Sequence, residues 1–167
     1  CVEAPPREVA RGEQGELLVR GPQVFQGYWK NPEETAKMLL PGGWLRTGDV
    51  VVQDADGFTT IVDRLKELII TGGFNVSPSE VERVLRTHDA VEDAAVVGRR
   101  NASGGEDVVA VITVAAGQPA PTLKEIRAFA KQSLAAYKAP RDLVIVDELP
   151  RSMLGKVLRK QVRDELL

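Results

Sequence analysis

The sequence predicts an α+β protein in two parts: a mainly β segment over residues 1–64 and a small domain of strands and helices over residues 65–167. Three observations predict this class. A strand–turn–strand pattern lies in the first part, two helix-capping boxes lie in the second, and helix, strand, strand, helix, strand follow one another between residues 77 and 146. Hydrophobic residues make up 43% of the chain, which is enough to bury a core and excludes a largely disordered protein.

The first part is predicted to be mainly strands. Residues 15–21 (GELLVRG) fit a short strand closed by a Gly-Pro pair. Asn31 supplies a helix N-cap, followed by a proline and two glutamates in the first turn, so a short helix through about Leu40 is expected. Residues 44–54 (WLRTGDVVVQD) and 58–63 (FTTIVD) flank an Asp-Gly turn with β-branched residues, which predicts a hairpin.

A charged segment, residues 63–67 (DRLKE), marks the predicted boundary between the two parts. Beyond it, residues 77–80 (SPSE) have the serine, proline and glutamate of a capping box. An apolar stripe follows at Val81, Val84 and Leu85, with the spacing of one helix face. The second part is therefore expected to contain a helix directly after residue 77.

The remaining elements of the second part are predicted from apolar runs and a second cap. Residues 91–98 (VEDAAVVG) and 107–116 (DVVAVITVAA) fit two buried strands joined by the polar loop RRNASGGE. A capping box at residues 122–125 (TLKE) opens another helix. A strand over residues 143–146 and a terminal helix near residues 159–167 complete the small domain.

Composition excludes several classes of protein. Subtracting 24 acidic from 22 basic residues gives a net charge of −2 without a basic stripe, so a nucleic-acid partner is not expected. One cysteine and one histidine supply neither a disulfide nor a zinc site; Cys1 is interpreted as incidental and His88 as a helix-terminal or solvent-facing residue. The longest apolar run, residues 108–116, is far shorter than the roughly 20 residues that cross a bilayer.

Two positions have the residue types of a ligand site. Asp49 follows a glycine at a strand boundary (RTGD), where its carboxylate can accept two hydrogen bonds from a vicinal diol such as ribose; the alternative is an ordinary turn aspartate. Gly72 and Gly73 are expected between a strand and the capped helix. Their missing side chains allow a ligand or another backbone to approach closely, or simply form a tight turn.

Charged residues supply further candidates. Arg64 and Lys66 lie in the joint between the two parts, which is either a hinge that contacts ligand or a solvated linker. Lys156 ends the loop PRSMLGK, so a flexible loop presents an ammonium group there; the alternative is a surface lysine without function. Arg99 and Arg100 lie near a loop, where they either meet a phosphate or belong to a solvated turn.

The two tryptophans are interpreted as packing residues. Trp29 and Trp44 are large apolar side chains in the first part, and Trp44 is positioned to support the RTGD segment. Neither is expected to take part in chemistry.

Five segments, taken in order, resemble the C-terminal part of AMP-forming acyl-CoA synthetases of the adenylate-forming superfamily. They are GELLVRGPQVFQGYWKNPEET, GGWLRTGD, DGFTTIVDRLKELIITGGFNVSPSEVE, YKAP and LPRSMLGKVLRK. The resemblance implies that residues 1–64 are the mainly β end of a large domain and residues 65–167 a complete small lid domain with a mixed sheet and helices. The chain has no initial methionine and lacks the family's phosphate loop, so it is expected to be a fragment.

The resemblance also implies roles for individual residues. Asp49 matches the aspartate that holds the ribose hydroxyls of ATP and of the acyl-adenylate, and Arg64 matches an arginine near the same nucleotide. Lys66 falls at the hinge about which the lid rotates between two half-reactions. Lys156 matches the adenylation lysine, which reaches the substrate carboxylate and the α-phosphate. No metal ligand is expected in this chain.

For the second half-reaction, the resemblance implies a tunnel for the pantetheine of coenzyme A. Gly72, Gly73 and Phe74 are expected to line it after the lid has rotated, with the glycines allowing close backbone approach. The implied cofactors are ATP, coenzyme A and Mg²⁺, whose ligands are expected upstream.

The implied partner is a small-molecule carboxylic acid, namely a fatty acid, because DRLKELIITGGFNVSPSEVE resembles medium- and long-chain ligases. Two alternatives stay open: an adenylating enzyme that passes the acyl group to a carrier protein, and a non-catalytic interaction module without a phosphate loop. The fragment alone is expected to be inactive. A cytoplasmic location is expected, and a homo-oligomer stays open.

Overall fold

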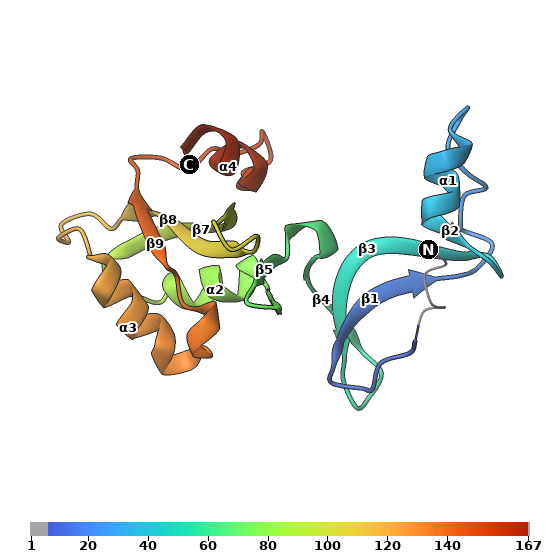
Figure 1. The fold of residues 1–167 in the computed structure, drawn as a ribbon, viewed down its shortest axis with the longest axis horizontal. Helices are drawn as coiled ribbons and strands as arrows, with labels where there is room; N and C mark the ends of the chain where they lie inside the picture. Colours follow the sequence, from blue (N-terminus) through green and yellow to red (C-terminus); the bar gives the residue numbers. More distant parts are fainter. Residues whose placement is uncertain (1–6, 167) are drawn as a thin grey trace. The chain divides into compact units, whose positions relative to one another are not determined.

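The chain forms two compact units, Cys1–Lys66 and Glu67–Leu167, in a computed structural model that describes residues 7–166 (Figure 1). These are called unit 1 and unit 2 below. The boundary predicted after Arg64 lies two residues before the observed one. The expectations for Cys1 lie outside the described residues.

From residue 7 onward, unit 1 is a four-stranded sheet with one helix, as the strand patterns predict. The long strand β3 (Trp44–Gln53) pairs antiparallel with β1 (Gln14–Val19), β2 (Leu39–Leu40) and β4 (Thr59–Arg64). The predicted hairpin is confirmed by the antiparallel pairing of β3 with β4. Helix α1 (Pro32–Met38) follows β1 in the chain.

Helix α1 begins where the sequence predicts and ends earlier. The side chain of Asn31 caps it by accepting a hydrogen bond of 3.1 Å from the Glu34 amide. The helix ends at Met38 and does not continue through Leu40, because Leu39 and Leu40 pair with β3 as strand β2. Strand pairing thus overrides the helical pattern over the last two residues.

Unit 2 begins with a hairpin that the sequence analysis missed. After a 3₁₀ turn over Leu65–Glu67, which spans the unit boundary, β5 (Ile69–Thr71) and β6 (Phe74–Val76) pair antiparallel. The expectation of one strand followed directly by a helix is therefore wrong. The two residues between the strands are Gly72 and Gly73, with φ of +57° and +82°. A two-residue hairpin turn of type I′ needs positive φ at both central positions, and glycine adopts it without strain.

The rest of unit 2 follows the predicted order of helix, strand, strand, helix, strand and terminal helix. Its elements are α2 (Pro78–Leu85), β7 (Val91–Arg100), β8 (Glu106–Val114), α3 (Leu123–Ser133), a 3₁₀ turn (Ala136–Lys138), β9 (Asp142–Ile145) and α4 (Arg159–Leu166). Strand β8 pairs antiparallel with β7 and parallel with β9. The mixed sheet confirms the predicted α+β class.

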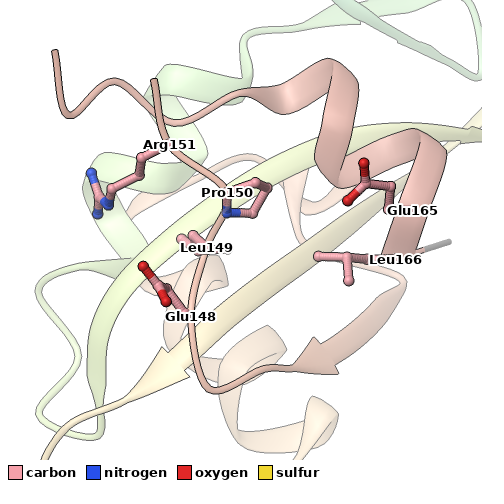
Figure 2. A pocket seen from close by; sticks show the side chains of 6 residues that line it. All are labelled: Glu148, Leu149, Pro150, Arg151, Glu165 and Leu166. Carbon is pink, nitrogen blue, oxygen red and sulfur yellow. The ribbon is translucent and has the colours of Figure 1, made fainter. Parts of the chain in front are cut away.

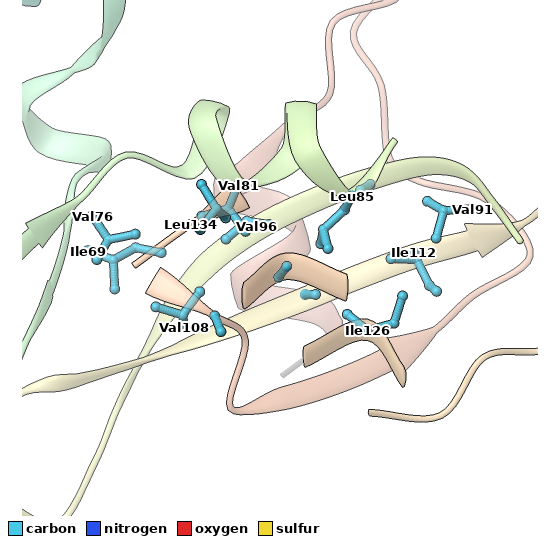
Figure 3. Packing of buried hydrophobic residues seen from close by; sticks show 14 residues of the cluster. Ile69, Val76, Val81, Leu85, Val91, Val96, Val108, Ile112, Ile126 and Leu134 are labelled. Atoms are coloured by element: carbon cyan, nitrogen blue, oxygen red, sulfur yellow. The ribbon is translucent and has the colours of Figure 1, made fainter. Parts of the chain in front are cut away.

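Both faces of this sheet are covered, and the central residues of β7 and β8 are apolar and buried. Successive residues of β7 alternate between two clusters: Ala94 and Val96 belong to the cluster with α2 and α3, whereas Ala95 and Val97 belong to the cluster with Val162 of α4. Figure 1 shows α4 on the opposite side of the sheet from α2 and α3. Figure 3 shows the first cluster, in which the side chains of the two helices meet those of the strands.

Both predicted helix caps of unit 2 are present. The Ser77 hydroxyl accepts a hydrogen bond from the Glu80 amide, and Thr122 and Glu125 form a reciprocal capping box. His88 lies just after α2, as expected for a helix-terminal residue. Its Nδ1 accepts a hydrogen bond from the Ala90 amide.

Two expectations about side chains are wrong. Trp29 does not pack, because it is 88% exposed. Arg99 and Arg100 do not belong to a solvated turn or to a loop, because β7 extends through both of them, and Arg99 pairs with Asp142 at 2.7 Å. Trp44 lies at the start of β3 with the Arg20 guanidinium 4.7 Å above its ring.

No helix within residues 7–166 is long and apolar enough to cross a membrane.

Candidate functional site

In unit 1, the structure brings the two predicted nucleotide-binding residues together. Asp49 on β3 and Arg64 on β4 are partners in the antiparallel register, and Arg64 Nε lies 2.8 Å from Asp49 Oδ1. The Asp49 side chain is 17% exposed, whereas that of Arg64 is 54% exposed. Among residues 7–166 Arg64 is the one side chain that pairs with this carboxylate, so Oδ2 remains able to accept a hydrogen bond from a hydroxyl group.

The backbone around Asp49 is fixed by Thr47. The Thr47 hydroxyl donates to the Leu17 carbonyl of β1 at 2.8 Å and accepts from the Asp49 amide at 3.1 Å. The Arg64 guanidinium also donates to the Thr47 carbonyl, at 3.3 Å. Asp49 and Arg64 are therefore held to the same three-residue segment, which limits the movement of the pair.

A second ion pair supports this segment, and the sequence analysis missed it. The Glu16 carboxylate on β1 accepts from Arg46 Nε at 3.0 Å and from Arg46 Nη2 at 2.8 Å. The same carboxylate accepts from the Gly48 amide at 3.3 Å. Glu16 lies 30 residues before Arg46, so only the pairing of β1 with β3 reveals the contact.

Lys66, the predicted hinge residue, is the last residue of unit 1. It is exposed and lies within the 3₁₀ turn, and Glu67, which follows it, belongs to unit 2. Glu67 Oε2 lies 3.8 Å from the Arg163 guanidinium of α4, so the charged joint has a contact within unit 2. The role of Lys66 as a hinge stays a prediction.

Gly72, Gly73 and Phe74 are brought together in the β5–β6 hairpin. A Cβ atom added to either glycine meets nothing within 4 Å, so no other part of this chain requires the missing side chains. The positive φ at both positions is instead the reason that glycine is favoured there. Phe74 is 54% exposed and stacks on Tyr137, with ring centroids 4.5 Å apart. The hairpin therefore presents an aromatic surface at its tip, and the predicted role in binding coenzyme A stays a prediction.

Lys156 lies in the predicted loop, which forms a turn closed by hydrogen bonds. Arg151 and Val157 form an antiparallel bridge across the loop. Within it, the Ser152 amide donates to the Lys156 carbonyl at 2.8 Å, and the Ser152 hydroxyl accepts from the Lys156 amide at 3.2 Å. The Lys156 side chain is exposed, and no carboxylate of residues 7–166 lies within ion-pair distance of its ammonium group. The turn thus presents an unpaired cation.

A hollow beside this turn holds none of the predicted site residues. Figure 2 shows Glu148 to Arg151 along one side and Glu165 with Leu166 of α4 along the other. Two carboxylates against one guanidinium make this hollow unsuited to an anionic substrate. Within the described part of the chain, no three His, Cys, Asp or Glu side chains are grouped so that they could hold a metal ion.

Comparison with known proteins gives consistent matches along the chain. A family model described as the AMP-binding enzyme C-terminal domain matches residues 80–156. The chain is 44% identical over 164 residues to the long-chain-fatty-acid–CoA ligase of Salmonella typhimurium, and 42% identical over 163 residues to the 2-succinylbenzoate–CoA ligase of Geobacillus kaustophilus. Each alignment covers 98% of this chain, but 29% and 33% of the respective relative.

A solved structure agrees with the sequence matches. ATP-bound MatB from Rhodopseudomonas palustris is similar with a TM-score of 0.87 and 36% identity, covering 96% of this chain and 32% of that chain. The chain therefore spans about a third of the length of the proteins it matches. Residues 80–156 therefore match the C-terminal domain of AMP-binding enzymes, and nearly the whole chain is similar to one part of known CoA ligases.

Proposed function

We propose that this chain is the C-terminal part of an ATP-dependent carboxylic acid–CoA ligase, which forms an acyl-adenylate and then an acyl-CoA. The observation that carries the proposal is Lys156, an exposed ammonium group without an ion-pair partner in the described chain, presented by an ordered turn. The ion pair of Asp49 with Arg64 supports it, since a carboxylate with an available oxygen suits a ribose diol.

Adenylation needs a cation more than it needs a proton carrier. The carboxylate of the acid attacks the α-phosphate of ATP, a bond forms between them, and pyrophosphate leaves. Two anions approach each other in this step, and negative charge is spread over the phosphoryl oxygens in the transition state. The Lys156 ammonium stabilises that charge, while Asp49 orients the nucleotide through its ribose. This chemistry explains why a chain with one histidine suffices for its part of the site.

For the second half-reaction we propose coenzyme A as the acceptor. The thiol of its pantetheine attacks the acyl carbonyl of the adenylate, a thioester bond forms, and AMP leaves. The β5–β6 hairpin with Phe74 at its tip is the proposed wall of the thiol tunnel. Rotation about Lys66 is proposed to withdraw Lys156 from the site and to bring this hairpin into its place. ATP and coenzyme A are the proposed cosubstrates, and Mg²⁺ is proposed to be bound outside this chain.

A fatty acid is the proposed acid. Support comes from the long-chain-fatty-acid–CoA ligase of Salmonella typhimurium, at 44% identity. The 2-succinylbenzoate–CoA ligase, at 42%, makes an aromatic acid the main competitor. Assay of the longer protein with a panel of fatty and aromatic acids decides between them, and parallel assays with coenzyme A and with a pantetheine-bearing carrier protein decide the acceptor.

The half-reactions test the role of Lys156. In the full-length enzyme, meaning the longer protein of which we propose this chain to be the end, Lys156→Ala should slow adenylate formation about 10²–10³-fold, as for other losses of one charge-stabilising donor. ATP–pyrophosphate exchange measures this step. Thioester formation from supplied acyl-adenylate should be nearly unchanged, because the cation acts on the phosphate chemistry.

A nearby lysine is the matched control. Lys160 is 86% exposed and pairs with Asp164 one helical turn on, so Lys160→Ala should leave both half-reactions intact. Equal loss of both half-reactions in Lys156→Ala would contradict the proposed role.

The 167-residue chain alone is proposed to be inactive, because the phosphate loop is absent from its sequence. The chain should therefore show no ATP–pyrophosphate exchange. The rival proposal, a non-catalytic interaction module, is excluded if the reading frame upstream of Cys1 encodes the phosphate loop.

A further inference from the structure

We infer that two ion pairs, Arg151–Asp93 and Arg159–Glu82, hold the two ends of the Lys156 turn and make these four residues positioning residues for its ammonium group. The inference rests on the proposed role of Lys156. Arg151 lies five residues before Lys156 and Arg159 lies three residues after it. Each arginine reaches a carboxylate far away in the sequence, one on β7 and the other on α2.

The pair at the C-terminal end of the turn joins a buried carboxylate to a half-buried guanidinium. Arg159 donates from Nε and Nη2 to the two oxygens of Glu82, at 2.7 and 2.8 Å, so the contact is bidentate. Arg159 also donates to the Ser79 hydroxyl at 2.7 Å, and Glu82 accepts from the Val96 amide at 2.9 Å. The Glu82 side chain is 6% exposed and that of Arg159 is 16% exposed. This end of the turn is thus fixed to α2 and β7 together.

The pair at the N-terminal end reaches the residue next to Lys156. One guanidinium nitrogen of Arg151 pairs with Asp93 on β7, and the other donates to the Gly155 carbonyl at 2.7 Å. Arg151 therefore connects β7 directly to the peptide group that joins Gly155 to Lys156. Loss of this guanidinium releases the backbone of Lys156 without touching its side chain.

Arg86 joins the two ion pairs into one network. Its Nε lies 2.6 Å from Asp93, and its Nη2 lies 3.6 Å from Glu82 and donates to the Ala94 carbonyl at 2.7 Å. Five charged side chains, alternating in sign, thus run from one end of the turn to the other through α2 and β7. Such a continuous network restrains the turn at both ends simultaneously.

A contribution to stability does not by itself account for the Arg151–Asp93 pair. Arg151 is 42% exposed, and ion pairs with an exposed partner contribute little to the free energy of unfolding. What Arg151 does change is the freedom of the turn, because it bonds to β7 and to Gly155 at once. A turn that is held in this way places the ammonium group in one position, and misplacement by about 1 Å lowers catalytic rates up to about 10²-fold.

Limited proteolysis of the 167-residue chain measures the freedom of the turn directly. The protease Lys-C cleaves after lysine, so the rate at the Lys156–Val157 bond reports how often the turn opens. In Arg151→Gln this rate should rise about fivefold to tenfold relative to the rate at Lys30–Asn31 in unit 1, because a charge-assisted hydrogen bond is lost. Arg163→Gln is the control, since Arg163 of α4 is 41% exposed and should leave the ratio unchanged.

The full-length enzyme measures the consequence for chemistry. Arg151→Gln and Asp93→Asn should each lower kcat for ATP–pyrophosphate exchange about tenfold, with little change in KM for ATP and no change in thioester formation from supplied acyl-adenylate. The double variant should lose less than the sum of the two single losses, because both single variants remove the Arg151–Asp93 pair.

Three results would overturn the inference: an unchanged cleavage ratio in Arg151→Gln, equal loss of both half-reactions, or additive losses in the double variant. If the unsubstituted full-length enzyme shows no ATP–pyrophosphate exchange, the proposed function fails instead. The cleavage ratio then still decides whether the ion pair holds the turn.

Discussion

The two units of the chain are stabilised in different ways. In unit 2 the sheet β7–β8–β9 is covered on both faces, and two clusters of buried aliphatic residues fill the space beneath its helices. In the described part of unit 1, Val50 is the one hydrophobic residue that is buried to the same degree. Large apolar side chains of unit 1 are exposed; they include Phe25, Tyr28, Trp29, Phe58 and Ile61.

This difference indicates where the stability of the chain resides. Removal of apolar surface from water is the main favourable term in folding, and backbone pairing alone contributes little net free energy. Unit 2 therefore has the core of an independent domain, whereas unit 1 has a hydrogen-bonded sheet with little buried apolar surface. The proposed catalytic lysine lies in the first kind of unit, and the proposed ribose-binding aspartate lies in the second.

Separating the units gives the largest expected effect. Residues 67–167 expressed alone should fold and unfold cooperatively, because their core is intact. Residues 1–66 expressed alone should show no cooperative thermal transition, since they bury too little apolar surface. Circular dichroism melts of the two polypeptides measure both. A cooperative transition in residues 1–66 would show that sheet pairing stabilises unit 1 without a core.

A single core substitution tests the same comparison on a smaller scale. Leu85→Ala removes a fully buried side chain of α2 and should lower the free energy of unfolding of unit 2 by about 2–5 kcal/mol. Phe58→Ala, at a 74% exposed position of unit 1, should change the free energy of unfolding of the chain by less than about 0.5 kcal/mol. Urea denaturation of both variants gives the two values, and similar losses would contradict the assignment of stability to unit 2.

The β5–β6 turn tests how local strain acts within unit 2. Gly73→Ala forces a side chain into left-handed φ and should cost about 1–2 kcal/mol, although its Cβ meets no neighbouring atom. Gly73→Asn should cost less, because asparagine tolerates this conformation better than alanine does. Equal costs of Gly73→Ala and Gly73→Asn in denaturant melts would show that the positive φ is not what makes glycine necessary there.

The pH dependence of Asp93 gives the smallest effect. Partial burial acts to raise the pKa of this carboxyl, but hydrogen bonds from Arg86 and the Ala94 amide, together with the charges of Arg86 and Arg151, outweigh it and hold the pKa below its usual 3.8. A lowered folded-state pKa contributes stability that is fully present above pH 3.8 and is lost as the pH falls through the folded-state value.

Asp93→Asn should therefore cost about 1 kcal/mol near neutral pH, where the ion pairs of the native carboxylate are complete. The difference between the native chain and this variant should shrink as the pH falls below 3.8. Thermal melts between pH 3 and 7 measure this difference. A difference that stays constant with pH would show that the carboxylate contributes through its shape alone.

Much of the fold follows from local patterns in the sequence. The caps at Asn31, Ser77 and Thr122 and the β3–β4 hairpin are confirmed, because these signals depend on neighbouring residues. The β5–β6 hairpin was missed for a physical reason. Its strands have three residues each, too few for an alternating pattern, so the tight turn that was one interpretation of Gly72 and Gly73 was not extended to a hairpin.

The candidate site, like the fold, contains residues that local sequence predicts and contacts that it does not. The motif around Asp49 and Arg64 identified both residues, and strand register then brings them into contact. The partners of Arg151 and Arg159 could not be predicted, because Asp93 and Glu82 lie 58 and 77 residues away in the chain and no spacing rule connects them. Trp29 was misjudged because a large apolar side chain predicts burial only when a core is available to receive it.

The burial of Glu82 restricts how this sequence can diverge. Replacing either Glu82 or Arg159 alone leaves a charge without its main partner inside the domain, whereas replacing both with apolar residues of similar volume avoids that cost. Single steps away from the pair are therefore disfavoured, and the two positions should change together among descendants of a common ancestor. Lineages that keep one of these side chains without the other should be rare.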